Sequence, residues 1–273
     1  MTQTVRALMA AGGLPGLEIR MLLEHVLQVP RAWLIAHDDE PLAPQAVERY
    51  LDLAQQRRDG QPMAYLLGRR EFMGHEFTIT SSVLIPRPDT ELLVEVAIEA
   101  LGGSEAPRVL DLGTGSGAIA VSVALACPGA RVVATDASAA ALEVAAGNAQ
   151  RLGARVEFCC GDWYQAMAAD RVFDLIVSNP PYIARHDAHL AQGDLRYEPQ
   201  AALTDGADGL RALAAIAAGA PERLAPGGQL WMEHGWDQAQ AVRGLLAAAG
   251  FGQLASRKDL AGIERVSGGS III

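Results

Sequence analysis

The residues best suited to chemistry are Asn179, Pro180, Pro181 and Tyr182, which follow the apolar, β-branched run 173–177 after one serine. This run predicts a buried strand, and the prolines must end it because proline lacks a backbone N–H and fixes φ. Asn179 offers one acceptor and two donors, the Pro180 carbonyl is a further acceptor, and Tyr182 gives a flat face for stacking. The loop is therefore expected to bind a planar amide or a ring amino group, with Asn179, Pro180 and Tyr182 as catalytic residues.

A glycine-rich segment follows an earlier predicted strand, residues 109–112. Glycines there let the backbone approach a ligand, and the N-terminus of the next helix suits a carboxylate or a phosphate. Asp136 ends the following strand, where its carboxylate can accept hydrogen bonds from both hydroxyls of a ribose. The expected cofactor-binding residues of the glycine segment are Gly113, Thr114, Gly115, Ser116 and Gly117.

The glycine segment by itself does not distinguish S-adenosylmethionine from NAD. The spacing of residues 113–118 also fits the fingerprint of dinucleotide-binding proteins, in which an acidic residue follows about 20 positions later. Asp162 and Trp163 follow the third strand and place an acceptor and an aromatic plane where an adenine could lie. The Asn-Pro-Pro-Tyr loop has no obvious task in hydride transfer. These features favour S-adenosylmethionine (SAM) over NAD, and they add Asp162, Trp163 and Asn179 to the expected cofactor-binding residues.

The elements that must position these side chains change type along the chain. Residues 1–70 are expected to be helical, because apolar side chains recur at helical spacing in 19–27 and again in 47–54. Residues 71–86 alternate partly between apolar and polar side chains, which predicts a β-hairpin linker. From 87 to 273 strands and Ala-rich helices alternate, which predicts a largely parallel sheet with helices on both faces. The expected strands of this part are 109–112, 132–134, 156–159, 173–177, 230–232, 251–256 and 263–267.

Composition narrows the location and the partners. The 22 basic and 32 acidic residues give a formal charge of −10. Proteins that bind bare nucleic acid usually carry an excess of basic residues, so we expect no direct DNA binding. No apolar run of 18 residues and no N-terminal signal region occur, which predicts a cytoplasmic protein without membrane association. Cys127, Cys159 and Cys160 form no C-x-x-C pair, which fits a reducing compartment, and no metal is expected.

Motifs along the whole chain resemble those of the HemK-type release-factor glutamine methyltransferases. The Asn-Pro-Pro-Tyr loop is shared with DNA adenine methyltransferases, but the segments before residue 95 are not, and they carry the assignment. The matching segments are residues 61–68, 71–72, 85–91, 111–117, 179–182, 198–199, 208–209 and 259–262.

The resemblance implies an α/β fold of the class I SAM-dependent methyltransferase type, Rossmann-like, with a seven-stranded, largely parallel sheet. An N-terminal helical bundle (1–70), expected to dock the release factor, and a β-hairpin linker (71–86) would precede this domain (87–273). The implied substrate is the glutamine of the Gly-Gly-Gln motif in class-1 peptide chain release factors, methylated on its side-chain amide nitrogen. SAM would be the methyl donor and S-adenosylhomocysteine the product, and residues 179–182 would bind the glutamine.

Three other functions are the alternatives. A nucleic-acid amino methyltransferase acting on a flipped adenine is the nearest, followed by a cofactor-binding regulator without catalysis and by a dehydrogenase. His186 and His189 lie three positions apart after the loop, but a solvated segment is the expected environment rather than a base or a metal site. His234, at the end of a strand, is expected to be a packing residue or to lie at a sheet edge.

Overall fold

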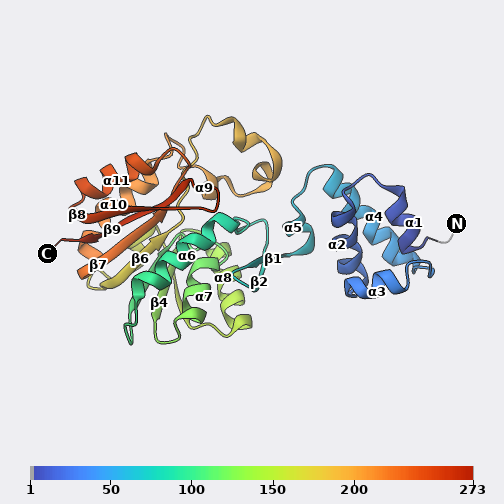
Figure 1. The fold of residues 1–273 in the computed structure, drawn as a ribbon, viewed down its shortest axis with the longest axis horizontal. Helices are drawn as coiled ribbons and strands as arrows, with labels where there is room; N and C mark the ends of the chain where they lie inside the picture. Colours follow the sequence, from blue (N-terminus) through green and yellow to red (C-terminus); the bar gives the residue numbers. More distant parts are fainter. Residues whose placement is uncertain (1–2, 273) are drawn as a thin grey trace. The chain divides into compact units, whose positions relative to one another are not determined.

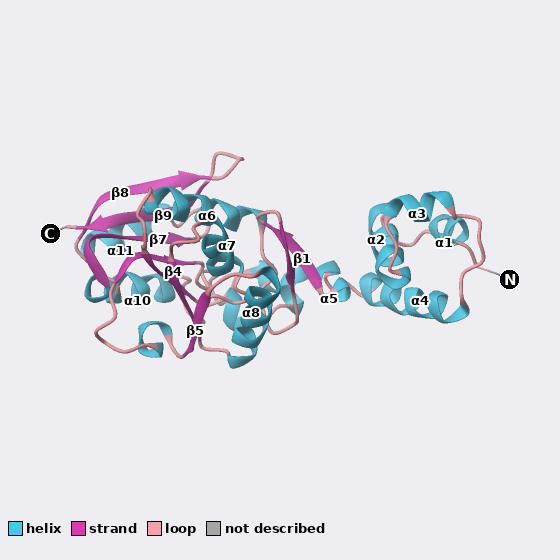
Figure 2. Ribbon diagram, turned by 90° about the horizontal axis from the view of Figure 1, so that it is seen from below, coloured by secondary structure: helices cyan, strands magenta, loops and turns pink. Residues whose placement is uncertain are grey.

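The computed structural model describes residues 3–272, which separate into two compact parts at the boundary between Arg69 and Arg70. Figure 1 follows the chain from the N-terminal helices to the strands of the second part, and Figure 2 colours the same elements by type. Within the described residues, no helix is both long and apolar enough to cross a lipid bilayer.

The N-terminal part is helical. Its buried core includes the predicted apolar stripe of α2, namely Ile19, Leu22, Leu23 and Val26. The stripe of α4 is narrower than its sequence suggests, because Tyr50 and Ala54 are buried whereas Leu51 is 46% exposed. Its helices are α1 (Val5–Ala11), α2 (Gly16–Leu27), α3 (Arg31–Ala36), α4 (Pro44–Arg58) and α5 (Met63–Leu67).

The second part begins with a two-stranded hairpin and continues into a seven-stranded sheet of order β5-β4-β3-β6-β7-β9-β8. The pairs β3–β4, β4–β5, β3–β6 and β6–β7 are parallel, whereas β9 runs antiparallel to both β7 and β8. The strands are β1 (Arg69–Phe72) and β2 (His75–Thr78) in the hairpin, then β3 (Arg108–Leu112), β4 (Arg131–Asp136), β5 (Val156–Cys160), β6 (Phe173–Ser178), β7 (Leu224–Glu233), β8 (Phe251–Lys258) and β9 (Glu264–Ile271).

Helices cover both faces of this sheet, so the expected fold class is confirmed. The first three helices of the second part pack on one another in series, and α10 packs on α11 against the opposite face (Figures 1 and 2). The helices are α6 (Pro88–Leu101), α7 (Ala118–Ala126), α8 (Ala139–Leu152), α9 (Gln200–Leu203), α10 (Arg211–Gly219) and α11 (Ala239–Ala248), with 3-10 turns η1 (Trp163–Ala166), η2 (Ala188–Ala191), η3 (Gly193–Tyr197) and η4 (Pro221–Arg223).

Strand β3 is the point where the strand order reverses, because β4 follows on one side of it and β6 lies on the other. In open parallel sheets, ligands bind outside the carboxyl ends of the strands at such a reversal. Leu110 and Leu112 of β3 and Ile176 of β6 are fully buried in the core beneath this edge. The fold therefore places the loops after β3, β4, β5 and β6 around one location.

Two strands, β7 and β9, extend furthest beyond the expected limits. Strand β7 begins at Leu224 and includes the segment Pro226-Gly227-Gly228, which accompanies a register shift against β6 between Phe173 and Leu175. Strand β9 continues through Gly268 to Ile271, where a Cβ added to Gly268 would lie 2.3 Å from the Trp231 ring. Glycine permits this close approach, but it weakens the alternating pattern from which strands are predicted.

Candidate functional site

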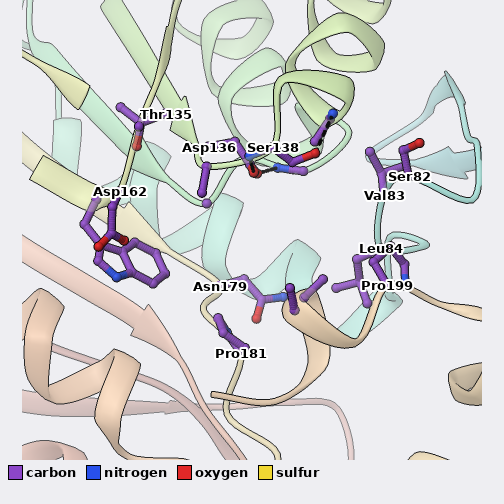
Figure 3. A pocket seen from close by; sticks show the side chains of 18 residues that line it. Ser82, Val83, Leu84, Thr135, Asp136, Ser138, Asp162, Asn179, Pro181 and Pro199 are labelled. Carbon is purple, nitrogen blue, oxygen red and sulfur yellow. Dashed lines mark hydrogen bonds between the residues drawn. The ribbon is translucent and has the colours of Figure 1, made fainter. Parts of the chain in front are cut away.

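A cavity of about 280 Å³ opens at the carboxyl edge of the parallel strands (Figure 3). In the figure, Asp162 lies on one side of it, Asn179 and Pro181 on another, and Leu84 with Pro199 on a third. The predicted site residues that line the cavity are Gly113, Gly115, Asp136, Asp162, Trp163, Asn179 and Pro181. The structure thus gathers residues from four different loops into one place.

The glycine loop after β3 is fixed to the end of β4 by hydrogen bonds from its own backbone. The N–H groups of Gly113 and Thr114 both donate to the Thr135 carbonyl at 2.9 Å, which ties the loop to the end of β4. Gly115 has φ +56°, and a Cβ added there would meet no atom within 4 Å, so its bare backbone faces open space. Gly113 has φ +73°, and its Cβ would lie 3.3 Å from the Trp163 ring. The two glycines therefore leave room for a ligand and for that ring.

Three residues of the loop support it rather than line the cavity. The Thr114 hydroxyl donates to Asp111 Oδ2 at 2.6 Å, and the Ala120 N–H donates to the same oxygen at 3.2 Å. Complete burial raises the pKa of Asp111 to about 7, despite these two hydrogen bonds. Ser116 is also buried, and a Cβ added to Gly117 would lie 3.1 Å from the Ala145 Cβ, so this glycine permits α7 and α8 to pack closely.

Asp136 lies at the tip of β4 with its carboxylate fixed in place. Its Oδ2 accepts from the Gly115 N–H and its Oδ1 from the Ser138 N–H, both at 2.9 Å. An ionised carboxylate offers about four lone-pair positions. Two therefore remain for hydroxyl groups of a ligand in the cavity.

Trp163 adopts an unusual backbone conformation at the start of η1. Its φ of 43° lies in the left-handed region, where a bulky residue is rare and strained. The residue nevertheless lines the cavity, and it packs against the sheet core. Such strain persists where the surrounding structure over-determines it, and it concentrates at ligand sites. The aromatic plane predicted for a base is therefore held at the cavity wall beside Asp162.

Asn179 follows β6 directly and lines the cavity. Its side-chain Nδ2 donates to the Thr90 hydroxyl at 3.1 Å. The preceding Ser178 hydroxyl donates to the Leu112 carbonyl at 2.7 Å, so the end of β6 is fixed against β3. Pro181 lines the cavity with Asn179, whereas the Pro180 ring is buried beside it.

Tyr182 is not among the residues that line the cavity. Its hydroxyl donates to Glu233 Oε1 at 3.2 Å, and its ring packs against the sheet core. Its carbonyl accepts from Gln238 Nε2 at 3.0 Å, and a Cβ added to Gly209 would lie 2.3 Å from that carbonyl oxygen. The expected stacking on a substrate amide is therefore not the arrangement seen, since Tyr182 is directed into the core and supports the loop.

One wall of the cavity was not anticipated from the sequence. Glu198 is buried and accepts from the Ile85 N–H at 3.0 Å, and it also pairs with Arg87. These contacts join two proline-containing segments, which the sequence marked as motifs without assigning them to the site. The unpredicted lining residues are Ser82, Val83, Leu84, Thr135, Ala137, Ser138, Ala141, Gly161, Pro199, Ala201 and Ala202.

The histidines lie outside the cavity lining. His189 is exposed and contacts Asp187 at 2.6 Å, and His186 is exposed in the same segment. His234 is fully buried, with Nε2 2.7 Å from the Ser267 hydroxyl, and burial lowers its pKa. Among residues 3–272, no group of three or more His, Cys, Asp or Glu side chains could hold a metal ion.

These features fit the expected cofactor. Asp136 can accept from ribose hydroxyls, Trp163 and Asp162 offer a plane and an acceptor to a base, and the open backbone at Gly115 leaves space for a charged amino-acid portion.

Comparisons with known proteins decide the family. Residues 1–68 match the PrmC N-terminal domain and residues 88–207 match the Methyltransferase small domain. The Release factor glutamine methyltransferase of Bordetella pertussis is 67% identical over 97% of this chain and 98% of its own length. This chain belongs to the release factor glutamine methyltransferase family. The family member of Burkholderia pseudomallei is 56% identical over 98% of this chain and 96% of its own length.

A solved structure shares the fold of this family member. It is a 16S rRNA methyltransferase of T. thermophilus in complex with AdoMet and guanosine, 24% identical, with a TM-score of 0.55 over 74% of this chain and 49% of that chain. The protein described here is a SAM-dependent methyltransferase.

Proposed function

We propose that this enzyme transfers a methyl group from SAM to the side-chain amide nitrogen of the glutamine in the Gly-Gly-Gln motif of class-1 peptide chain release factors. Membership of the family supports the substrate, and one observation supports the chemistry. Because Asn179 Nδ2 is engaged by Thr90, the Asn179 Oδ1 oxygen is left to accept a hydrogen bond at the cavity.

An amide nitrogen is a poor nucleophile, since its lone pair is delocalised into the carbonyl with a rotation barrier of about 18–20 kcal/mol. The site must therefore hold the nitrogen in line with the methyl group that it attacks. Asn179 Oδ1 and the Pro180 carbonyl are the two acceptors that would take the two N–H groups of the substrate amide. Their negative ends also favour the positive charge that develops on nitrogen during the transfer.

SAM, when bound, supplies an electrophilic methyl group on a sulfonium. The proposed cofactor contacts are Gly113, Gly115, Asp136, Asp162 and Trp163, with Asn179 between cofactor and substrate. An N-methylated amide cation is acidic enough to lose its proton to water. The reaction therefore needs no dedicated base among the residues of the cavity.

The N-terminal helical part is proposed to dock the release factor, which would be methylated in the cytoplasm. The formal charge of −10 supports a protein substrate over direct binding to DNA. A nucleic-acid amino methyltransferase remains the alternative outcome of the test below.

The test offers labelled SAM to four acceptors, namely a class-1 release factor, the same factor with its Gly-Gly-Gln glutamine replaced by alanine, duplex DNA and ribosomal RNA. We expect label only on the unaltered release factor, at the glutamine side chain. Label on DNA or RNA with none on the factor would support the nucleic-acid alternative and contradict the proposal.

A further inference from the structure

Behind Asn179 lies a group of buried polar side chains that the proposed reaction does not use. Asn179 Nδ2 donates to Thr90 Oγ1 at 3.1 Å, and the Thr90 hydroxyl lowers the pKa of the neighbouring, fully buried Glu233 carboxyl, whose Oε2 has no hydrogen-bond partner among the described residues. The Tyr182 hydroxyl donates to Glu233 Oε1 at 3.2 Å, so this carboxyl is tied to the loop that carries Asn179. The four residues come from the first turn of α6, the end of β7 and the loop after β6.

We propose that Thr90 is a positioning residue, which together with Glu233 and Tyr182 holds the Asn179 amide in the orientation that presents its oxygen to the substrate. This inference rests on the proposed role of Asn179 as an acceptor. It adds that the acceptor is oriented by residues outside the cavity lining.

The orientation follows from counting donors and acceptors. An ionised carboxylate can only accept hydrogen bonds, so the Tyr182 hydroxyl proton points to Glu233, and the unpartnered Oε2 of the carboxylate attracts the Thr90 hydroxyl proton. A hydroxyl has one proton, which leaves the Thr90 oxygen as an acceptor toward Asn179. Only the NH₂ end of the Asn179 amide can satisfy that acceptor. The oxygen end must then face the cavity.

The opposite orientation would oppose catalysis. If the Asn179 amide turned over, its NH₂ group would face the NH₂ group of the substrate amide, and two donors would meet without an acceptor. Asparagine has no preference of its own, because its terminal torsion is broad and roughly two-fold. A hydrogen bond from a neighbour is therefore needed to select one orientation.

The first turn of α6 is itself held in place on both sides of Thr90. Asp89 forms an ion pair with Arg265 at 3.2 Å, and Arg265 also pairs with Asp259 at 3.1 Å. On the other side, Glu91 Oε1 accepts from the Met73 N–H at 2.9 Å. Thr90 is buried between these anchors, so its hydroxyl has little freedom to adopt another position.

The carboxyl of Glu233 is fully buried, and burial raises its pKa to about 7. Asp89 raises this pKa further by its negative charge, whereas Arg265 and the hydroxyls of Thr90 and Tyr182 lower it. Assays at pH 8.5 therefore keep Glu233 in the ionised form that directs both hydroxyl protons.

The experiment compares Thr90→Val, Thr90→Ser and Asn179→Ala with the full-length enzyme in single-turnover methylation of a release factor at pH 8.5. Valine keeps the shape of threonine but removes the hydroxyl, and losing one orienting hydrogen bond should lower the rate about 10-fold. Serine restores the hydroxyl and should recover most of that loss. SAM affinity, measured by calorimetry, should stay within about threefold in Thr90→Val and Thr90→Ser, because the contact that valine loses bears on the substrate amide.

A double variant separates positioning from a general effect on the fold. In the Asn179→Ala background no amide remains to be oriented, so adding Thr90→Val should change the rate little further. Full additivity of the two losses, or no recovery with Thr90→Ser, would overturn the positioning role. If Asn179→Ala is slow while Thr90→Val keeps the wild-type rate, only this inference fails. If Asn179→Ala itself keeps the wild-type rate, the proposed role of Asn179 fails as well.

Discussion

Two loops at the same sheet edge are built in opposite ways. The loop after β3 is shaped by glycines and by backbone N–H groups that bind Thr135 and Asp136, so its geometry comes mainly from backbone contacts. The loop after β6 is stiffened by two prolines, and its functional side chain is held by Thr90 and by the buried Glu233 behind it. One loop exposes bare backbone, and the other exposes a single oriented side chain.

The difference matches the two tasks proposed for the loops. A cofactor with many polar atoms can be bound by several weak backbone and carboxylate contacts, of which no single one is decisive. A single amide nitrogen must instead be aimed, and aiming depends on the orientation of very few groups. Substitutions in the first loop should therefore affect SAM affinity, and substitutions in the second should affect the rate of transfer.

The largest effect is expected for Asn179→Ala. Loss of one hydrogen bond made in the transition state should lower kcat by about 10²–10³, with SAM affinity largely kept. Single-turnover kinetics on a release factor, with calorimetry of SAM binding, measures both quantities. A loss of less than a few-fold in the rate would remove the proposed contrast between the loops.

For Asp136→Ala we expect a smaller effect, and we expect it on SAM affinity rather than on the rate of transfer. Removing hydrogen bonds to a charged group costs about 1.5–3 kcal/mol, which corresponds to about 10–100-fold weaker SAM binding. At saturating SAM, kcat should change only a few-fold. Unchanged SAM affinity by calorimetry would exclude Asp136 from the cofactor site, and an equal loss in kcat would mean that the two loops do not divide the tasks.

A third prediction concerns the pH dependence of stability that the buried Glu233 carboxyl behind Asn179 should cause. The folded protein raises the pKa of Glu233 from 4.5 to about 7, so folding takes up a proton in this range and the free energy of unfolding falls as pH rises. At about 1.4 kcal/mol per pH unit, the upper limit of this loss is about 3 kcal/mol. The variant E233Q lacks this contribution, because a glutamine side chain at position 233 does not titrate.

Denaturant unfolding of both proteins at pH 5 and pH 8 measures this contribution. We expect E233Q to gain stability relative to the wild type between the two pH values, because only the wild type must bury a charge at pH 8. A difference between the two proteins that does not change with pH would show that Glu233 is not held in a charge-excluding environment.

Much of the fold and part of the site could be predicted from short segments. The order of strands and helices follows from local apolar patterns, and residues 113–117 identify themselves by their glycine spacing. Tyr182 was expected in the cavity, but its ring packs into the core and its hydroxyl binds Glu233, 51 positions later. No local pattern could reveal that partner.

The sequence by itself determined the alternating strands and helices, the glycine loop, the acidic residue at the end of β4 and the proline-stiffened loop after β6, because each depends on neighbouring residues. Only the tertiary structure decided which end of the Asn179 amide faces the cavity. That choice depends on Thr90, 89 positions away, and on a carboxyl group buried at the end of β7. Hydrogen-bond direction is set by groups that meet through folding, and residues so far apart leave no periodic signal in the chain.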